Sequence, residues 1–424
     1  KYHLIDVRNN NFSLGLVYQE KDDAYIDIDD NLIFIEGGKA ILRTSEKDGF
    51  NHIYKLGLDG KQTQITKGDF DVIDFKGVDE RNNLIYFTSA ERGAIYKDVY
   101  AIRTNGKNKR RLTEKAGFND ATFSEGMKYY VHSWSNANTP PVYTLMKANG
   151  ETIAILEDNE ILQFLMKEYG FQTKEFFEIQ GAAMKLNAWM IKPANFDPSK
   201  KYPVYFDIYA GPGSNKVNDA FESANLAYHQ LLAQKGYIVF CVDPRGTMRR
   251  GAAFKKSTYL QLGKLETEDL LAVAKELTKR SYVDAERLGI MGWSYGGYMS
   301  SLVMTKGEGL FKMGIAVAPV TNWRFYDNIY TERFMRTPQE NAAGYDDNSP
   351  INFLDQLQGK YLLIHGTGDD NVHVQNTYEM VKALVKADKQ FDLFIYPNKD
   401  HGINGGNTRN HLFKMMLDYT LENL

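Results

Sequence analysis

Residues 1–158 show short apolar runs that end in Asp-Gly or Asn-Gly, the pattern of strands joined by tight turns. These dipeptides favour the positive φ angles that two-residue hairpin loops require. A further apolar strand is expected before each hairpin, such as residues 83–89 and 128–134. The turn glycines recur about every 45 residues, a period typical of repeat architectures. The three hairpins lie at residues 53–66, 99–113 and 142–156, with turn glycines Gly60, Gly106 and Gly150.

A repeat of this length with about four strands per unit indicates a β-propeller. The alternative is a string of unrelated hairpins. We predict that residues 1–158 form about three blades, with part of another before residue 53. A closed propeller needs more blades, so the sequence is expected to begin inside a propeller or to carry an open array of sheets.

From residue 159 the pattern changes to apolar strands that alternate with amphipathic helices, which predicts a parallel sheet covered on both faces. We therefore expect an α/β domain over residues 159–424. Strands are predicted at 174–180, 186–193, 202–213, 237–243, 287–294, 313–319, 361–370 and 391–397. Helices are predicted at 160–171, 266–279, directly after residue 294, and at 376–386 and 408–422.

Composition narrows the class of protein without naming a function. With 43% hydrophobic and 25% charged residues, the chain is typical of a globular protein with a real core. A net charge of -3 gives no indication of a nucleic-acid or anionic-membrane partner, and the basic run 107–111 reads as a solvated turn. Cys241 is the only cysteine, so no internal disulfide can form. The sequence contains no 18-residue apolar span, and its start at Lys1 without Met suggests a fragment or a processed form.

The segment "RLGIMGWSYGG" indicates where chemistry takes place. It reads as strand, tight turn and helix, and Gly292 and Gly296 flank Ser294 in a G-x-S-x-G pattern. Glycine is needed there because a serine on a strained strand-to-helix turn brings neighbouring backbone too close for β-carbons. We therefore predict that Ser294 is a nucleophile exposed at the end of a sheet strand.

A serine hydroxyl needs a base, and the base needs an orienting carboxylate. In α/β-hydrolases these follow in the order Ser, Asp or Glu, His, on loops after later strands. Here Asp369 and Asp370 follow one predicted strand and His401 follows the next, so either aspartate could serve. A metal site built from His365, His373 and the two aspartates is the alternative; it lacks a fixed ligand spacing such as H-E-x-x-H, so no metal is predicted.

Five motifs in this order resemble the dipeptidyl peptidase IV branch of the prolyl oligopeptidase family of serine peptidases. They are "DIYAGPGS", "GWSYGGY", "AVAPVTNWRFYDNIYTERFM", "YLLIHGTGDDNVH" and "KDHGI". The resemblance extends from residue 202 to the C-terminus and, more weakly, over the propeller repeats. It implies an α/β-hydrolase domain that follows the last blades of a β-propeller.

The resemblance also implies roles for individual residues. Ser294 would be the nucleophile, His401 the general base and acid, and Asp369 the orienting carboxylate. Tyr209 would stabilise the oxyanion through its hydroxyl, together with the backbone N–H of Tyr295.

Substrate contacts are implied in the same way. Trp323, Tyr326 and Tyr330 have the spacing of one helical face, a pattern that by itself is more often core than pocket. In the family, Asn371 would bond a substrate carbonyl. The residues matching the wall of the family's small apolar proline pocket are Tyr295, Val320, Trp323, Tyr326, Tyr330 and Val372.

The expected activity is release of X-Pro, or less well X-Ala, dipeptides from the N-terminus of short peptides, without metal or organic cofactor. Family members dimerise partly through C-terminal helices, so residues 408–422 are a candidate homodimer interface, and the resemblance places the protein in the periplasm or outside the cell. The glutamate pair with which the family holds the substrate ammonium has no match in residues 1–159, and its segments are expected upstream.

Two alternatives stay open. The first is a prolyl tripeptidyl or prolyl endopeptidase, which shares the pocket but lacks the glutamate pair. The second is a non-catalytic binding scaffold, which the intact Ser294, Asp369 and His401 disfavour.

Overall fold

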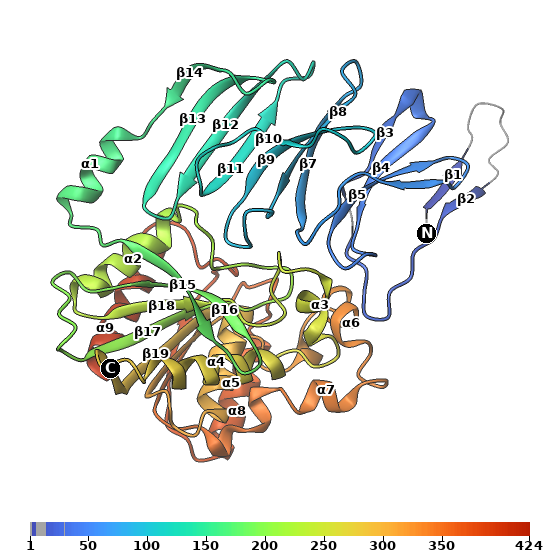
Figure 1. Ribbon diagram of the computed structural model, residues 1–424. Helices are drawn as coiled ribbons and strands as arrows, with labels where there is room; N and C mark the ends of the chain where they lie inside the picture. The colour runs from blue at the N-terminus through green and yellow to red at the C-terminus, as the bar shows by residue number, and fades with distance from the viewer. Residues whose placement is uncertain (1, 6–13, 29) are drawn as a thin grey trace. The chain divides into compact units, whose positions relative to one another are not determined.

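The computed structural model describes residues 2–5, 14–28 and 30–424, which form two compact units (Figure 1). The β unit comprises Lys1–Glu160, Asn218–Ala220 and Arg249–Ala253. The α/β unit comprises Ile161–Val217, Phe221–Met248 and Phe254–Leu424. The second half of the sequence thus contributes two short segments to the β unit.

The described part of the β unit contains three four-stranded antiparallel sheets and one strand pair. The first sheet runs β3 (Ile33–Ile35), β4 (Ala40–Ser45), β5 (His52–Gly57), β6 (Gln62–Gln64). The second runs β7 (Val72–Asp79), β8 (Leu84–Ser89), β9 (Asp98–Arg103), β10 (Arg110–Arg111). The third runs β11 (Phe118–Phe123), β12 (Tyr129–Asn136), β13 (Thr139–Lys147), β14 (Thr152–Glu157), and the pair is β1 (Tyr2–Ile5) with β2 (Leu14–Tyr18).

These sheets confirm the predicted repeats, because each predicted hairpin supplies the last two strands of one sheet. The turn glycines Gly60, Gly106 and Gly150 have φ of 81°, 78° and 97°, the left-handed region that the Asp-Gly and Asn-Gly pairs favour. Inner strands such as β8 are buried along almost their whole length, whereas every residue of the edge strand β14 is exposed. Burial on both faces explains why the inner strands read as continuous apolar runs.

The α/β unit is built on one eight-stranded sheet, in which β15 and β16 pair antiparallel at one edge and the strands from β18 to β22 run parallel. Its spatial order is β15 (Lys174–Gln180), β16 (Lys185–Ile191), β18 (Ile238–Val242), β17 (Tyr202–Ile208), β19 (Val283–Trp293), β20 (Met313–Val317), β21 (Lys360–Gly366), β22 (Asp392–Tyr396). The central parallel strands are almost entirely buried, as expected for a sheet covered by helices. This architecture confirms the predicted fold class.

Helices lie between and after the strands (Figure 1). The α-helices are α1 (Glu160–Glu168), α2 (Ser223–Gln234), α3 (Ala252–Lys255), α4 (Lys264–Leu277), α5 (Tyr295–Lys306), α6 (Asn328–Met335), α7 (Ala342–Asp346), α8 (Gln375–Lys386) and α9 (Thr408–Asn423). Short 3-10 helices occur at Glu36–Gly38, Lys256–Thr258, Trp323–Phe325, Pro350–Asn352 and Leu354–Gln356. In the part of the chain that the structure describes, no helix has the length and apolarity needed to cross a bilayer.

The register of the sheet aligns the strand ends that matter for the site. Ile208 of β17 pairs with Gly292 of β19, and Trp293 pairs with Val317 of β20. Gly366, the last residue of β21, pairs with Tyr396, the last residue of β22. Residues that directly follow these strands therefore emerge along one edge of the sheet, where open α/β sheets bind ligands.

Candidate active site

Ser294 occupies a strained turn between β19 and α5. Its φ of 59° and ψ of -117° lie outside the regions that a side chain normally favours. A Cβ on Gly292 would come within 2.0 Å of the carbonyl oxygen of Gly296, and a Cβ on Gly296 within 2.4 Å of that of Ile208. The backbone N–H of Ser294 donates to Val317 O at 2.8 Å, which ties the turn to the next strand. The predicted steric reason for both glycines is confirmed.

Asp369 follows β21 and is surrounded by hydrogen-bond donors. Its Oδ2 accepts from His401 Nδ1 at 2.7 Å and from His365 Nε2 at 3.2 Å. Its Oδ1 accepts the backbone N–H groups of Asn371, at 3.0 Å, and Val372, at 2.9 Å. Burial alone would raise the pKa of the Asp369 carboxyl, but the hydrogen bonds from His365 and His401 hold it well below its ordinary value. Asp369 is therefore a carboxylate at neutral pH.

This contact distinguishes the two aspartates, between which the residue pattern left the choice open and the family resemblance favoured Asp369. Asp369 is 6% exposed and faces His401, whereas its neighbour Asp370 is exposed. A carboxylate can only accept, so the proton on His401 must lie on Nδ1 when the ring is neutral. His401 Nε2 is then unprotonated and able to take a proton.

A backbone contact brings His401 to the serine turn. The indole N–H of Trp293, the residue before Ser294, donates to the backbone carbonyl of His401 at 3.0 Å. Among the residues described, no hydrogen bond joins the Ser294 hydroxyl to the His401 ring. Catalytic hydrogen bonds are often long before substrate binds, so this arrangement still suits a nucleophile and its base.

Tyr209 and Tyr295 come from different segments, and their rings are in contact. Tyr209 directly follows β17, and its ring centroid lies 6.2 Å from that of Tyr295. Burial raises the pKa of the Tyr209 hydroxyl, so it stays protonated and able to donate. Tyr295 is the first residue of α5, where a backbone N–H has no acceptor inside the helix. Both groups are donors suited to an oxyanion.

The aromatic residues predicted to line a pocket do gather, but they do not share one helix as predicted. Trp323 lies in a 3-10 turn, Tyr326 is extended with ψ of 164°, and Tyr330 lies in α6. The reason is Asp327, whose carboxylate accepts the Tyr330 N–H at 2.8 Å and starts a new helix as its N-cap. Trp323 and Tyr330 nevertheless stack with ring centroids 5.9 Å apart.

These rings continue into the serine turn. The Tyr295 ring lies 5.4 Å from Trp323, and Tyr326 lies 5.3 Å from Tyr330. Val320 and Val372 are buried at 2% and 0% exposure. The four rings therefore form one aromatic cluster that reaches Tyr295, the residue after Ser294.

Asn371 joins this aromatic cluster to the Asp369 loop. Its Oδ1 accepts the Tyr326 hydroxyl at 2.6 Å, which leaves the amide NH2 to donate. Burial, with a smaller contribution from Asp327, raises the pKa of Tyr326 to about 12, so this hydroxyl stays a donor.

Two functional contacts were missed from the sequence. His365 was considered only as a metal ligand, yet both its nitrogens are engaged: Nε2 with Asp369 Oδ2 and Val372 O, and Nδ1 with Thr377 Oγ1 at 2.7 Å. Its position four residues before Asp369 was the available signal. The Trp293 indole contact had no signal in sequence. Within the described ranges, no three His, Cys, Asp or Glu side chains are arranged to hold a metal ion.

Comparisons with known proteins agree over both units. Residues 223–424 match the model of the prolyl oligopeptidase family, and residues 2–141 match that of the dipeptidyl peptidase IV N-terminal region. The chain is 35% identical over 399 residues to a probable dipeptidyl-aminopeptidase B of Phaeosphaeria nodorum, covering 90% of this chain and 44% of the relative. It is 35% identical over 439 residues to dipeptidyl peptidase 4 of Felis catus, covering 98% of this chain and 57% of the relative.

A solved structure gives the same result. The crystal structure of Porphyromonas gingivalis dipeptidyl peptidase 4 matches with a TM-score of 0.95 and 43% identity, over 100% of this chain and 60% of that one. The chain thus spans about half the length of the curated relatives it matches.

Proposed function

Because this chain belongs to the prolyl oligopeptidase family of serine peptidases, we propose that it acts as a serine exopeptidase that releases N-terminal X-Pro or X-Ala dipeptides from short peptides. The observation that carries the proposal is the 2.7 Å hydrogen bond between Asp369 and His401 beside the strained turn of Ser294. An orienting carboxylate, a base with its free nitrogen available and a serine on a strand-to-helix turn are the three parts of serine-peptidase chemistry.

The first step is attack of Ser294 Oγ on the peptide carbonyl carbon while His401 Nε2 takes the hydroxyl proton. The ring then carries a positive charge, which the adjacent Asp369 carboxylate stabilises. His401 returns that proton to the leaving amine, and an acyl-enzyme forms on Ser294. Water, deprotonated by the same nitrogen, then cleaves the ester and regenerates the serine.

The carbonyl oxygen becomes negatively charged during attack and needs donors at that moment. The Tyr209 hydroxyl and the Tyr295 backbone N–H supply them in this proposal, since both emerge beside Ser294. Donors of this kind typically contribute 10²–10³-fold to the rate.

The residue before the cleaved bond lies against the aromatic cluster. Proline presents apolar ring faces and has no N–H to satisfy, so flat aromatic walls bind it without loss of a hydrogen bond. Trp323, Tyr326 and Tyr330, with Tyr295, Val320 and Val372, form that wall in the proposal. The Asn371 amide, held by Tyr326, donates to a substrate carbonyl.

Two measurements test the function. A fluorophosphonate probe should label the protein at Ser294, and Ser294→Ala should abolish labelling. Among chromogenic substrates, Gly-Pro with a free amino terminus should be cleaved faster than Ala-Ala-Pro or N-blocked Gly-Pro. Faster cleavage of blocked substrates would replace the dipeptidyl assignment by an endopeptidase, and a folded protein that takes no label would be a binding scaffold.

Three further parts of the proposal concern the molecule as a whole. Residues 1–158 form part of a β-propeller domain and residues 159–424 the hydrolase domain. The protein forms homodimers partly through α9, which light scattering of the purified protein would test. It works in the periplasm or outside the cell, which fractionation of the source cells would test.

A further inference from the structure

Glu266 is a fully buried acidic residue that the proposed mechanism does not use. It lies in the first turn of α4 and is 0% exposed. Its Oε2 accepts the backbone N–H of Gly263 at 3.0 Å, and its Oε1 accepts the hydroxyl of Tyr295 at 2.7 Å. Both oxygens therefore have a donor, and one of the donors is the residue that follows the proposed nucleophile.

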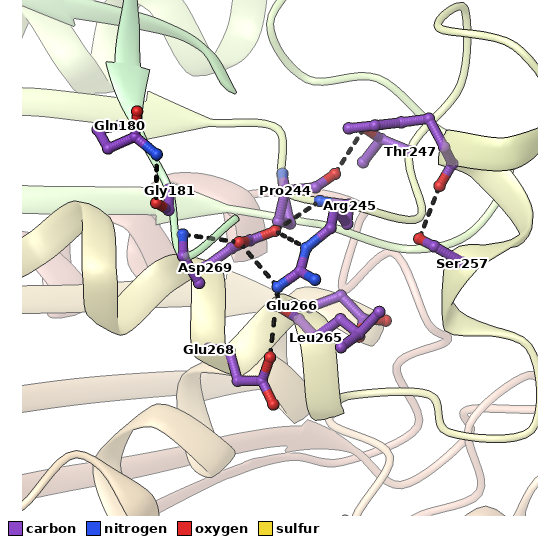
Figure 2. A network of polar contacts seen from close by, with 12 residues as sticks. Gln180, Gly181, Pro244, Arg245, Thr247, Ser257, Leu265, Glu266, Glu268 and Asp269 are labelled. Carbon is purple, nitrogen blue, oxygen red and sulfur yellow. Dashed lines mark hydrogen bonds and ion pairs between the residues drawn. The ribbon is translucent and has the colours of Figure 1, made fainter. Parts of the chain in front are cut away.

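No cation accounts for the position of this carboxyl. Arg245, which lies in the loop after β18 and contacts the first turns of α4, is engaged elsewhere: its guanidinium contacts Asp269 at 2.9 Å and Glu268 at 3.3 Å (Figure 2). In the parts of the chain that the structure covers, Glu266 makes no ion pair. Burying a carboxyl without a cation partner costs free energy, so a contribution to stability does not explain why Glu266 is there.

Glu266 fixes the Tyr295 side chain through the hydrogen bond from its hydroxyl. That ring is 3% exposed and is in contact with three others, Tyr209 at 6.2 Å, Tyr298 at 5.3 Å and Trp323 at 5.4 Å between centroids. Apolar ring contacts set where the Tyr295 ring packs, and they have little directional preference. The hydroxyl bond to Glu266 is the directional contact that fixes its far end.

We propose that Glu266 is a positioning residue for the active site, acting through Tyr295. By anchoring the Tyr295 hydroxyl, its carboxyl holds the ring as a pocket wall and the first turn of α5 as the source of the oxyanion-binding N–H. This inference rests on the proposed function and adds a residue outside the proposed catalytic and binding set.

The two consequences can be measured separately. Loss of the hydrogen bond to Glu266 should displace the Tyr295 backbone N–H. A small displacement weakens the hydrogen bond that this N–H donates to the oxyanion, so kcat should fall. It should also lower the preference for Pro over Ala before the cleaved bond, because the ring is part of the pocket. A mutation that only reduced the folded fraction would lower kcat for both substrates by the same factor and leave their KM values and the Pro-to-Ala ratio unchanged.

The experiment compares Glu266→Leu, Glu266→Gln and Tyr295→Phe with the wild type, using Gly-Pro and Gly-Ala substrates and the rate of fluorophosphonate labelling. Glu266→Leu and Tyr295→Phe should each lower kcat/KM for Gly-Pro about tenfold, and the double variant should be no worse than either. Glu266→Gln should stay near wild type, because its carbonyl accepts from Gly263 and its NH2 donates to the Tyr295 oxygen. Glu268→Leu, on the same turn of α4, is the matched control and should have no effect.

The outcomes separate this inference from the function on which it rests. Wild-type protein that neither labels nor cleaves contradicts the function, and crystal structures of wild type and Glu266→Leu then still show whether the Tyr295 ring moves. Wild-type activity together with unchanged kinetics in Tyr295→Phe overturns the positioning role, even where Glu266→Leu fails to fold. Additive losses in the double variant would also overturn it.

Discussion

At the scale of single residues, Asp369 shows how one carboxylate can serve several donors. Its four hydrogen bonds come from two imidazoles and two backbone N–H groups of its own loop. The backbone bonds fix the carboxylate within its loop, and His365 supports it from the buried side. His401 is the other imidazole partner; its side chain is 22% exposed, and its backbone carbonyl contacts Trp293, the residue before Ser294.

Replacing Asp369 by Asn should lower kcat about 10⁴-fold. The Asn NH2 favours the His401 tautomer with its proton on Nε2, and a neutral amide cannot stabilise the imidazolium. Turnover of a Gly-Pro substrate is the measurement. Asp370→Asn is the control, since Asp370 is exposed, and a comparable loss in both variants would contradict the assignment.

Glu266 gives a second prediction at this scale, on stability. Burial raises its pKa from 4.5 to about 7, against the smaller opposing effect of the Tyr295 hydrogen bond. The folded state therefore favours the neutral carboxyl more than the unfolded state does. Its stabilising contribution is fully present below pH 4.5 and is lost as the pH rises through about 7.

The loss corresponds to about 3 kcal/mol of unfolding free energy. The Gln side chain of Glu266→Gln cannot ionise, so this variant should not show that loss. Its unfolding free energy minus that of the wild type should therefore increase from pH 5 to pH 8. Denaturant titrations at both pH values measure the difference, with Glu268→Gln as an exposed control. A difference between Glu266→Gln and wild type that does not change with pH would contradict the prediction.

At the scale of elements, the junction of β19 and α5 depends on the absence of side chains. Gly292 and Gly296 lie where a Cβ would overlap backbone carbonyl groups. A Cβ added at Gly297 would lie 2.9 Å from Val317 O. Backbone cannot move aside as a flexible side chain can, so the strand and helix meet at this distance only with glycine in place.

Gly292→Ala should therefore displace the turn, costing on the order of 2–4 kcal/mol of stability and most of the Ser294 reactivity. Melting temperature and fluorophosphonate labelling are the readouts. Gly126→Ala is the control, because a Cβ there meets nothing within 4 Å. Full labelling of the Gly292→Ala variant would show that the turn tolerates a side chain.

At the scale of the whole molecule, the two units differ in their internal architecture. The β unit is a set of similar four-stranded sheets, whereas the α/β unit has one continuous sheet with a buried centre. Cys241 lies in that centre, on β18, at 0% exposure, and burial raises the pKa of its thiol well above the ordinary value. It is the only cysteine of the chain, so its reactivity reports on the α/β unit alone.

The native protein should react with a thiol reagent such as DTNB at least about 100-fold more slowly than the unfolded chain, because only open states expose the sulfur. Its melting temperature should not change on addition of a reducing agent. Rapid native-state reaction would mean that the sheet opens locally near β18.

Much of this protein could be read from sequence because its signals are local. Hairpin turns, alternating strands and helices, and the glycines around Ser294 are constraints between near neighbours in the chain, and the structure confirms them. The order Ser294, Asp369, His401 along a parallel sheet was readable for the same reason, since strand ends share an edge.

Only tertiary structure decided the contacts between segments far apart in sequence. It brought the Trp293 indole to His401, interrupted the expected Trp323–Tyr330 helix at Asp327, and placed the Glu266 carboxyl against the Tyr295 hydroxyl. Each depends on where two elements pack against each other, and a hydrogen bond requires placement to within a few tenths of an ångström. Local pattern specifies the elements, while the direction in which a side chain points is settled by the packing around it.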